Sequence, residues 1–225
     1  MRSAVIFDMD GVIVDSEPAH IKAEMETLSP FGIELKEEEL RDYMGRSSRV
    51  LFRDIIKKYE LNTTFEKIYS VHKRNLLRLY QDEVGLIEGV VVFIERLLRS
   101  GFILALASSS DREIIDSVLN KFNLRRFFST AVSGEEIERT KPDPEIFLVA
   151  SERLRVDPAS CVVIEDSYAG VKAAKSAGMF CVGFRSKHSL NQNLSIADIL
   201  INSFDELSVE ELAAITNGYQ NKKGL

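Results

Sequence analysis

Two hydrophobic patterns alternate along most of this chain. Short apolar runs predict buried strands at Val5–Phe7, Phe102–Ala107, Ala131–Val132, Cys161–Ile164, Met179–Gly183 and, as an edge strand, Ile199–Ile201. Apolar residues spaced three and four apart predict helices over Gly89–Arg99, Asp111–Phe122, Pro144–Leu154, Tyr168–Ala177 and Ser208–Ile215. Continuously apolar strands that alternate with helices indicate an α/β fold, a doubly wound parallel sheet covered on both faces.

Capping residues set the expected ends of several helices. Ser100-Gly101 ends the helix that begins near Gly89, and Gly178 closes the helix before it. Asp143 is expected as the N-cap of the helix over Pro144–Leu154, with Pro144 at the first helical position. The polar tail from Asn217 is expected to fray.

The stretch from the end of the first strand to Asp82 has a different character. Helical periodicity covers residues 21–26, 37–44, 50–59 and 65–80, and no strand pattern interrupts it. We therefore expect residues 16–82 to form a helical insert. Residues 1–15 and 83–225 would then form the α/β core.

Composition narrows the class of protein further. The chain has 225 residues, is 45% hydrophobic and 28% charged, and carries a net charge of −6. These values are typical of a soluble globular protein and give no reason to expect nucleic acid or a membrane as a partner. No signal-peptide pattern and no apolar run near the ~20 residues of a membrane span is present, so we expect a cytoplasmic protein. We also expect a monomer, with Cys161 and Cys181 as buried, reduced thiols.

Carboxylates and serines cluster at the ends of three predicted strands. Asp8 and Asp10 end the first strand, Ser108–Ser110 a second, and Glu165 and Asp166 a third. Alternate side chains of an extended segment share a face, so Asp8 and Asp10 leave their strand on the same side. Open parallel sheets bind ligands beyond the carboxyl ends of their strands. The predicted architecture therefore gathers these groups at one edge.

Taken singly, each feature has a simpler explanation. The two aspartates are compatible with a solvated turn, the serines with a helix N-cap, and Glu165-Asp166 with the acidic start of a helix. Lys141, in the loop before Pro144, is compatible with an exposed loop lysine. Their joint occurrence at one edge of the sheet favours a functional site instead.

As a set, these groups suit phosphoryl transfer. Carboxylate oxygens suit Mg²⁺ better than zinc, which prefers histidine or cysteine. One carboxylate can attack phosphorus to form an aspartyl-phosphate, and a second can protonate the leaving oxygen and then activate water. A hydroxyl and backbone N–H groups can hold the phosphoryl oxygens, and a lysine offsets their charge.

Four motifs in this sequence resemble those of the haloacid dehalogenase superfamily, in the subgroup of β-phosphoglucomutase and related sugar-phosphate phosphatases. They are Asp8–Glu17 (DMDGVIVDSE), Ala107–Ser110 (ASSS), Lys141–Phe147 (KPDPEIF) and Ile164–Gly170 (IEDSYAG). The resemblance covers nearly the whole chain.

The resemblance implies Asp8 as nucleophile and Asp10 as general acid/base. The phosphate contacts that it implies are Ser108, Ser109 and Lys141. The Mg²⁺ ligands that it implies are Asp8, the Asp10 carbonyl and Asp166, with Glu165 assisting. The presence of aspartate at position 10 argues against a dehalogenase, which does not need this general acid.

By the same resemblance, the helical insert is a cap that closes over the core, excludes water and sets specificity. His20 aligns with a histidine near the mutase hinge, and Arg49 with a cap arginine that binds the substrate's distal phosphate. Lys73 or Arg74, of which we favour Arg74, falls where the mutase has a cap lysine. All of these are equally compatible with hinge packing or exposed helix charges. His72 and His188 are expected at the surface.

The function expected from these features is a Mg²⁺-dependent phosphatase that hydrolyses small phosphorylated metabolites, above all sugar phosphates. The alternative is a phosphomutase, which returns the phosphoryl group to a bound intermediate; Glu17-Pro18 after the hinge favours the phosphatase. A receiver-type signalling domain or a non-enzymatic phosphate-binding protein is a further alternative. A receiver has no helical insert after its first strand, and here the lysine precedes the second acidic pair.

Overall fold

The computed structural model describes residues 3–36, 39, 48–187 and 192–221. Most of the helix expected over residues 37–44 therefore lies outside the described residues, as does His188. Within the described part of the chain, no helix is long and apolar enough to cross a membrane.

A six-stranded parallel sheet forms the centre of the molecule, as predicted. Its order is β5-β4-β1-β6-β7-β8. The strands are β1 (Ala4–Phe7), β4 (Ile103–Ser108), β5 (Thr130–Ser133), β6 (Cys161–Glu165), β7 (Phe180–Phe184) and β8 (Ile199–Ile201). Each coincides with an expected strand to within one or two residues. The four central strands are almost wholly buried because both faces of the sheet are covered, whereas the edge strands β5 and β8 are only partly buried.

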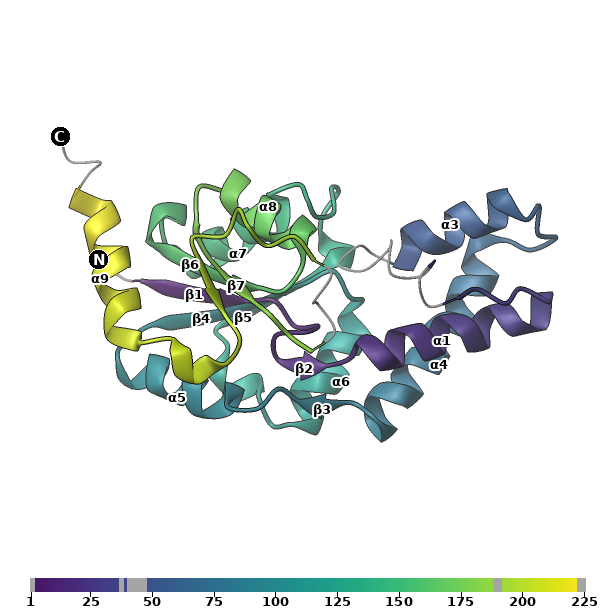
Figure 1. The fold of residues 1–225 in the computed structure, drawn as a ribbon, viewed down its shortest axis with the longest axis horizontal. Coiled ribbons are helices and arrows are strands. Elements are labelled where there is room, and N and C mark those ends of the chain that lie inside the picture. The colour runs from purple at the N-terminus through teal and green to yellow at the C-terminus, as the bar shows by residue number, and fades with distance from the viewer. Residues whose placement is uncertain (1–2, 37–38, 40–47, 188–191, 222–225) are drawn as a thin grey trace.

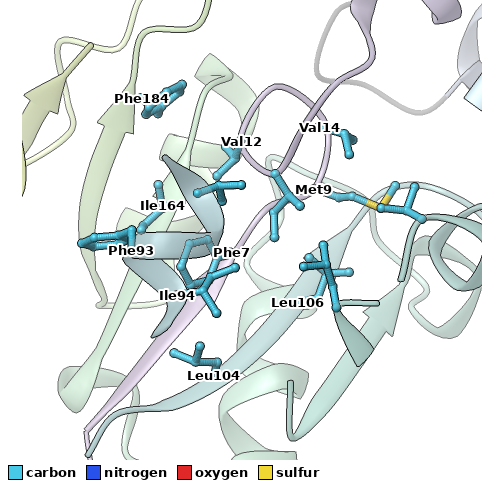
Figure 2. Close-up of a cluster of buried hydrophobic side chains, with 14 of the residues drawn as sticks. Phe7, Met9, Val12, Val14, Phe93, Ile94, Leu104, Leu106, Ile164 and Phe184 are labelled. Atoms are coloured by element: carbon cyan, nitrogen blue, oxygen red, sulfur yellow. The ribbon is translucent and has the colours of Figure 1, made fainter. Parts of the chain in front are cut away.

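Helices cover both faces of this sheet. One face packs on α5 (Val90–Arg99), α6 (Arg112–Lys121) and α9 (Val209–Asn221), the other on α7 (Glu145–Leu154) and α8 (Tyr168–Ser176). In β1 the alternation is direct, since Val5 and Phe7 enter the first core and Ala4 and Ile6 the second. Figure 2 shows Phe7 against Phe93 and Ile94 of α5 and against Leu104 and Leu106 of β4. Cys161 and Cys181 are buried free thiols, as expected.

Two helix ends differ from the prediction. Helix α7 begins at Glu145, and Pro144 rather than Asp143 is its N-cap, because the Pro144 carbonyl accepts the first intrahelical bonds. The Asp143 carboxylate still accepts the Glu145 N–H at 3.0 Å. Helix α9 continues to Asn221, past the expected fraying point at Asn217. A helix that has already formed extends at little cost into polar residues, and buried Thr216 holds this turn through the Leu212 carbonyl.

The helices α1 (Glu17–Leu28), α3 (Ser48–Lys58) and α4 (Phe65–Asp82) form a helical segment that extends from one end of the sheet (Figure 1). They enclose an apolar cluster of their own, centred on Leu51, Phe52 and Ile68. Two strands that the sequence pattern did not predict connect this segment to the rest of the chain. β2 (Val14–Asp15) pairs antiparallel with β3 (Gly85–Leu86), so the outgoing and returning chains lie side by side.

Candidate active site

A pocket lies beside the carboxyl end of β1, between the sheet and the helical segment. The chain runs from β1 to β4 and β5 on one side and then to β6, β7 and β8 on the other, so β1 stands where the strand order reverses. The expected site residues that line this pocket are Asp8, Asp10, His20, Ser109, Lys141, Glu165 and Asp166. The architecture therefore brings together residues from four separate parts of the sequence.

Lys141 lies between two buried carboxylates. Its Nζ is 2.5 Å from Oδ1 of Asp8 and 2.6 Å from Oε1 of Glu165, and all three side chains are less than a tenth exposed. Burial raises the pKa of Asp8 to about 8; Lys141 opposes this shift, while Glu165 and Asp10 add to it. The peptide bond from Lys141 to Pro142 is cis. An exposed loop lysine, the simpler explanation from sequence, is wrong here.

Asp10 accepts hydrogen bonds from both sides of its carboxylate. Ser16 Oγ donates to Oδ1 at 2.7 Å and the Tyr80 hydroxyl donates to the same oxygen. On Oδ2, Ser110 Oγ donates at 2.9 Å and Ser108 Oγ at 3.4 Å. The Asp10 side chain is therefore held jointly by Ser16, by the serines at the end of β4 and by the last turn of α4.

His20 completes this arrangement. Its Nε2 is 3.5 Å from Asp10 Oδ1 and 2.9 Å from the Tyr80 hydroxyl. Burial alone would lower the pKa of His20, but the interaction with Asp10 outweighs it and raises the pKa to about 9. Burial alone would raise the pKa of Asp10, but His20, Tyr80 and Ser16 lower it below its ordinary value. At neutral pH the pair therefore holds one proton.

Asp166 packs against the loop that follows Asp8. A methyl group at Gly11 would lie 1.9 Å from Asp166 Oδ2, and Gly11 has a φ of +75°, so only glycine fits there. Burial, together with the charges of Glu165 and Asp8, raises the pKa of Asp166 well above its ordinary value. Asp8 is buried and Asp166 is half-buried, and the two carboxylates repel each other, an arrangement that a cation would stabilise.

The serine loop after β4 is supported from β5. Ser108 is fully buried, and its Oγ accepts the Ser110 N–H at 3.1 Å. Ser133 Oγ donates to the Ser110 carbonyl at 2.8 Å. A side chain at Gly134 would lie 2.4 Å from the Ser109 carbonyl oxygen, so the close approach of the two loops requires glycine. Ser108 contacts Asp10, whereas Ser109 lines the pocket.

The helical segment supplies the other side of the pocket. Its lining residues there are Glu24, Ser48, Tyr69, His72, Lys73 and Leu76. Arg49 and Arg74, the cap residues favoured from sequence, are not among them; Arg49 instead contacts Asp111 and Glu135. Of the two candidates for a cap lysine, the structure places Lys73 rather than Arg74 at the pocket, because Lys73 shares the helix face of Tyr69 and Leu76.

The expectation that His72 lies at the surface is wrong. Its side chain is 1% exposed, and its ring centroid is 4.7 Å from that of Phe52 and 5.8 Å from that of Tyr69. Neither ring nitrogen has a hydrogen-bond partner of normal geometry among the described residues. Burial, with the nearby charge of His20, lowers the pKa of His72 to about 3, and the Ala23 backbone opposes this only in part.

Among the residues that hydrogen-bond to Asp10, Tyr80 and Ser110 are two that the sequence analysis did not single out. Tyr80 lies 70 positions from Asp10 and gave no motif, since its spacing on α4 is that of an ordinary core residue. Ser110 belonged to the serine cluster without a role of its own. Ser16 stood inside the first motif, and only its contact to Asp10 distinguishes it.

These features define an α/β enzyme whose acidic, lysine-containing pocket lies under a helical segment. The chain belongs to the haloacid dehalogenase-like hydrolase family, whose sequence model matches residues 5–184. The match spans the first strand, the helical segment and the core through β7.

Named relatives and solved structures agree with this assignment. The chain is 33% identical to a phosphorylated carbohydrates phosphatase of Thermotoga maritima, over 87% of this chain and 90% of the relative. It is similar to the crystal structure of β-phosphoglucomutase from Clostridium difficile, with a TM-score of 0.84, 25% identity and coverage of 97% and 99%. It is also similar to mutant CbbY from Rhodobacter sphaeroides in complex with xylulose 1,5-bisphosphate, with a TM-score of 0.83, 25% identity and coverage of 92% and 97%.

Proposed function

We propose that this protein is a phosphatase that hydrolyses phosphate monoesters of small metabolites, in particular sugar phosphates, through an aspartyl-phosphate on Asp8. The observation that carries the proposal is the pairing of Asp8 with Lys141 on the pocket floor, beside a second carboxylate that is held by a histidine. The names of the carbohydrate phosphatase relative and of the mutase structure support this substrate class.

In this mechanism Asp8 attacks the phosphorus atom and the bond to the leaving oxygen breaks. The proton that the Asp10–His20 pair holds passes through Asp10 to that oxygen. Asp10 then accepts a proton from water, which attacks phosphorus and releases phosphate from Asp8. Lys141 offsets the charge of Asp8 and of the phosphoryl oxygens, and Glu165 holds the lysine in place.

Mg²⁺ is the cofactor that we propose for this site. Among the described residues, no three His, Cys, Asp or Glu side chains gather in a metal-binding arrangement. Mg²⁺ is often held by only one or two carboxylates plus water and substrate phosphate, and Asp8 and Asp166 with the Asp10 carbonyl fit that pattern. When bound, the ion would neutralise phosphoryl charge. Glu165 would assist indirectly, because Lys141 and Ser167 already occupy its oxygens.

We further propose that the helical segment, residues 16–82, is a cap over the core formed by residues 1–15 and 83–225. Its side chains complete the pocket, and α4 supplies the Tyr80 contact to Asp10. Closure of such a segment would exclude water from the reaction. A cytoplasmic location and a monomeric state remain predictions.

The direct test replaces the nucleophile. Asp8→Asn should abolish phosphate release from p-nitrophenyl phosphate in the presence of Mg²⁺, whereas Asp205→Asn, at an exposed position far along the chain, should leave it unchanged. Near-normal turnover by Asp8→Asn would reject the assignment. β-Glucose 1-phosphate separates the two candidate reactions, because a phosphomutase would convert it to glucose 6-phosphate without releasing phosphate.

A further inference from the structure

Three side chains of the cap converge on one carboxylate of the core. Asp111 follows the serine loop directly, lines the pocket and is 4% exposed. Its Oδ1 accepts hydrogen bonds of 2.9 Å from both Arg49 and the Tyr69 hydroxyl, and its Oδ2 is 3.6 Å from Lys73 Nζ. Asp111 is therefore the meeting point of α3 and α4 with the core.

Further carboxylates share the same two cations. Glu135 Oε1 is 3.1 Å from Arg49, and Glu113 Oε2 is 2.9 Å from Lys73. The Arg49 guanidinium also lies 4.5 Å from the centroid of the Tyr69 ring. In this cluster three core carboxylates face two cap cations, so the positive charge of Arg49 and Lys73 is already balanced within the protein.

We propose that Asp111 makes this site selective for monophosphates with an uncharged leaving group and causes it to reject bisphosphates. This proposal rests on the proposed phosphatase function. A second phosphate would need Arg49 or Lys73 as its counter-charge. To obtain them it would have to displace Asp111, which would leave a buried carboxylate without a partner beside a new anion. The similar CbbY structure holds a bisphosphate, so this fold does not itself exclude such ligands.

An uncharged polyol meets no such obstacle. Hydroxyl groups can donate to carboxylates and accept from hydroxyl or ammonium donors without displacing an ion pair. Glu24, Ser48 and Tyr69 are lining residues of this kind on the cap side of the pocket, and Ser48 Oγ already donates to Glu24 at 3.2 Å. The leaving group that this wall fits is neutral and rich in hydroxyls.

The experiment compares two ligands that differ by one phosphate, fructose 1-phosphate and fructose 1,6-bisphosphate. The wild-type enzyme should prefer the monophosphate in kcat/KM by about tenfold or more. Asp111→Asn keeps the shape and removes the charge, and should reduce this preference about tenfold, mainly through a lower KM for the bisphosphate. Glu113→Gln is the matched control, because the Glu113 carboxylate also contacts Lys73 but is 61% exposed. In this variant the ratio of kcat/KM for the two ligands should change less than about threefold.

A wild-type enzyme that hydrolyses both ligands equally, or a preference that Asp111→Asn leaves intact, would overturn the proposal. Asp111→Ser provides a second variant if the Asp111→Asn protein folds poorly. In the Asp8→Asn background, calorimetry should show the same change in the relative affinities for the two ligands, and unchanged relative affinities would also count against the role of Asp111. Failure of the wild-type enzyme to release phosphate from both ligands and from p-nitrophenyl phosphate would instead reject the proposed function.

Discussion

Among single residues, Glu165 shows how closely the site is packed. Its carboxylate accepts from Lys141 Nζ on one oxygen and from the Ser167 N–H and hydroxyl on the other. It also occupies the space that a side chain on Gly170 would need, 1.7 Å from the position of a Cβ there. The lysine that pairs with Asp8 is thus positioned by a carboxylate that only a glycine on α8 can accommodate.

Gly170→Ala should therefore displace Glu165 and disturb Lys141. We expect a loss of about 1–3 kcal/mol in the free energy of unfolding, typical of an overpacked core, together with a clear fall in kcat. Urea unfolding and phosphate-release kinetics measure the two effects. Gly85→Ala is the control, because among the described residues no heavy atom beyond its two chain neighbours lies within 4 Å of the added Cβ. Equal behaviour of the two variants would contradict the packing argument.

His72 is a second residue whose effect, here on the pH dependence of the free energy of unfolding, can be measured separately. Its folded-state pKa is about 3, below the ordinary value of 6.5, because burial disfavours the charged ring. A group with a depressed pKa contributes stability fully above 6.5, and this stability is lost as the pH falls from 6.5 towards 3. Lowering the pH from 7.5 to 5.0 should thus destabilise the wild-type protein through His72 by about 2 kcal/mol.

His72→Leu should lack this part of the pH dependence. Urea unfolding of both proteins at pH 7.5 and 5.0 gives the comparison, and the difference between them removes the contributions of other groups such as Glu24, whose pKa burial raises to about 7. The substitution should be near neutral at pH 7.5, because it removes two buried ring nitrogens that have no hydrogen bond of normal geometry to any described residue. Identical pH dependence in both proteins would show that His72 is not buried as described.

At the level of elements, the connection between the helical segment and the rest of the chain depends on helix ends. Helix α4 ends at Asp82, and its terminal turn carries the Tyr80 contact to Asp10. Lys121 of α6 donates to the backbone carbonyls of Tyr80 at 2.8 Å and Val84 at 2.7 Å. A cation at a helix C-terminus is favourable, so α6 stabilises the end of α4 just where the chain returns through β3.

Lys121→Met should loosen this helix end. We expect a loss of about 1 kcal/mol, since both carbonyls lose a charged donor but water can replace it at this exposed side chain. Faster amide hydrogen exchange at Glu83 and Val84, whose N–H groups bond to Leu79, should accompany it. Lys172→Met, at an exposed position on α8, should change neither measurement. Unchanged amide hydrogen exchange at Glu83 and Val84 in Lys121→Met would show that Lys121 does not stabilise the end of α4.

At the scale of the whole molecule, the fold concentrates negative charge at one point. The strand order reverses at β1, so Asp8, Glu165 and Asp166 meet in one pocket although they are distant in sequence. Lys141 balances only part of this charge, as the raised pKa values of Asp8 and Asp166 indicate. The folded state should therefore bind a divalent cation that the unfolded chain does not.

Mg²⁺ should accordingly raise the melting temperature of the whole protein. At about 100 times the dissociation constant the gain would be about 2.7 kcal/mol, which corresponds to about 5–10 °C for a chain of this size. Removal by EDTA should reverse the shift, and KCl of matched ionic strength should not produce it. Asp166→Asn should largely abolish the response, so a full shift in that variant would exclude Asp166 as a ligand.

Much of this fold could be predicted from sequence, because buried segments have a recognisable local pattern of apolar residues. The strands of the sheet are continuous apolar runs, and the helices carry apolar residues three and four apart. The two-residue strands β2 and β3 were missed because such a short segment has no periodicity. His72 was misplaced because one polar residue on an apolar helix face reads the same whether it is exposed or packed between rings.

By itself, the sequence determined the α/β class, the edge of the sheet at which the polar groups gather, and the acidic, serine and lysine motifs found there. These follow from residue type and spacing, which are properties of neighbours along the chain. Only the tertiary structure decided which groups touch: Lys141 with Asp8 across 133 positions, Tyr80 with Asp10 across 70, and Arg49 with Asp111 across 62. Such pairings depend on how the strands of the sheet and the helical segment pack together in space, and no local pattern records that packing.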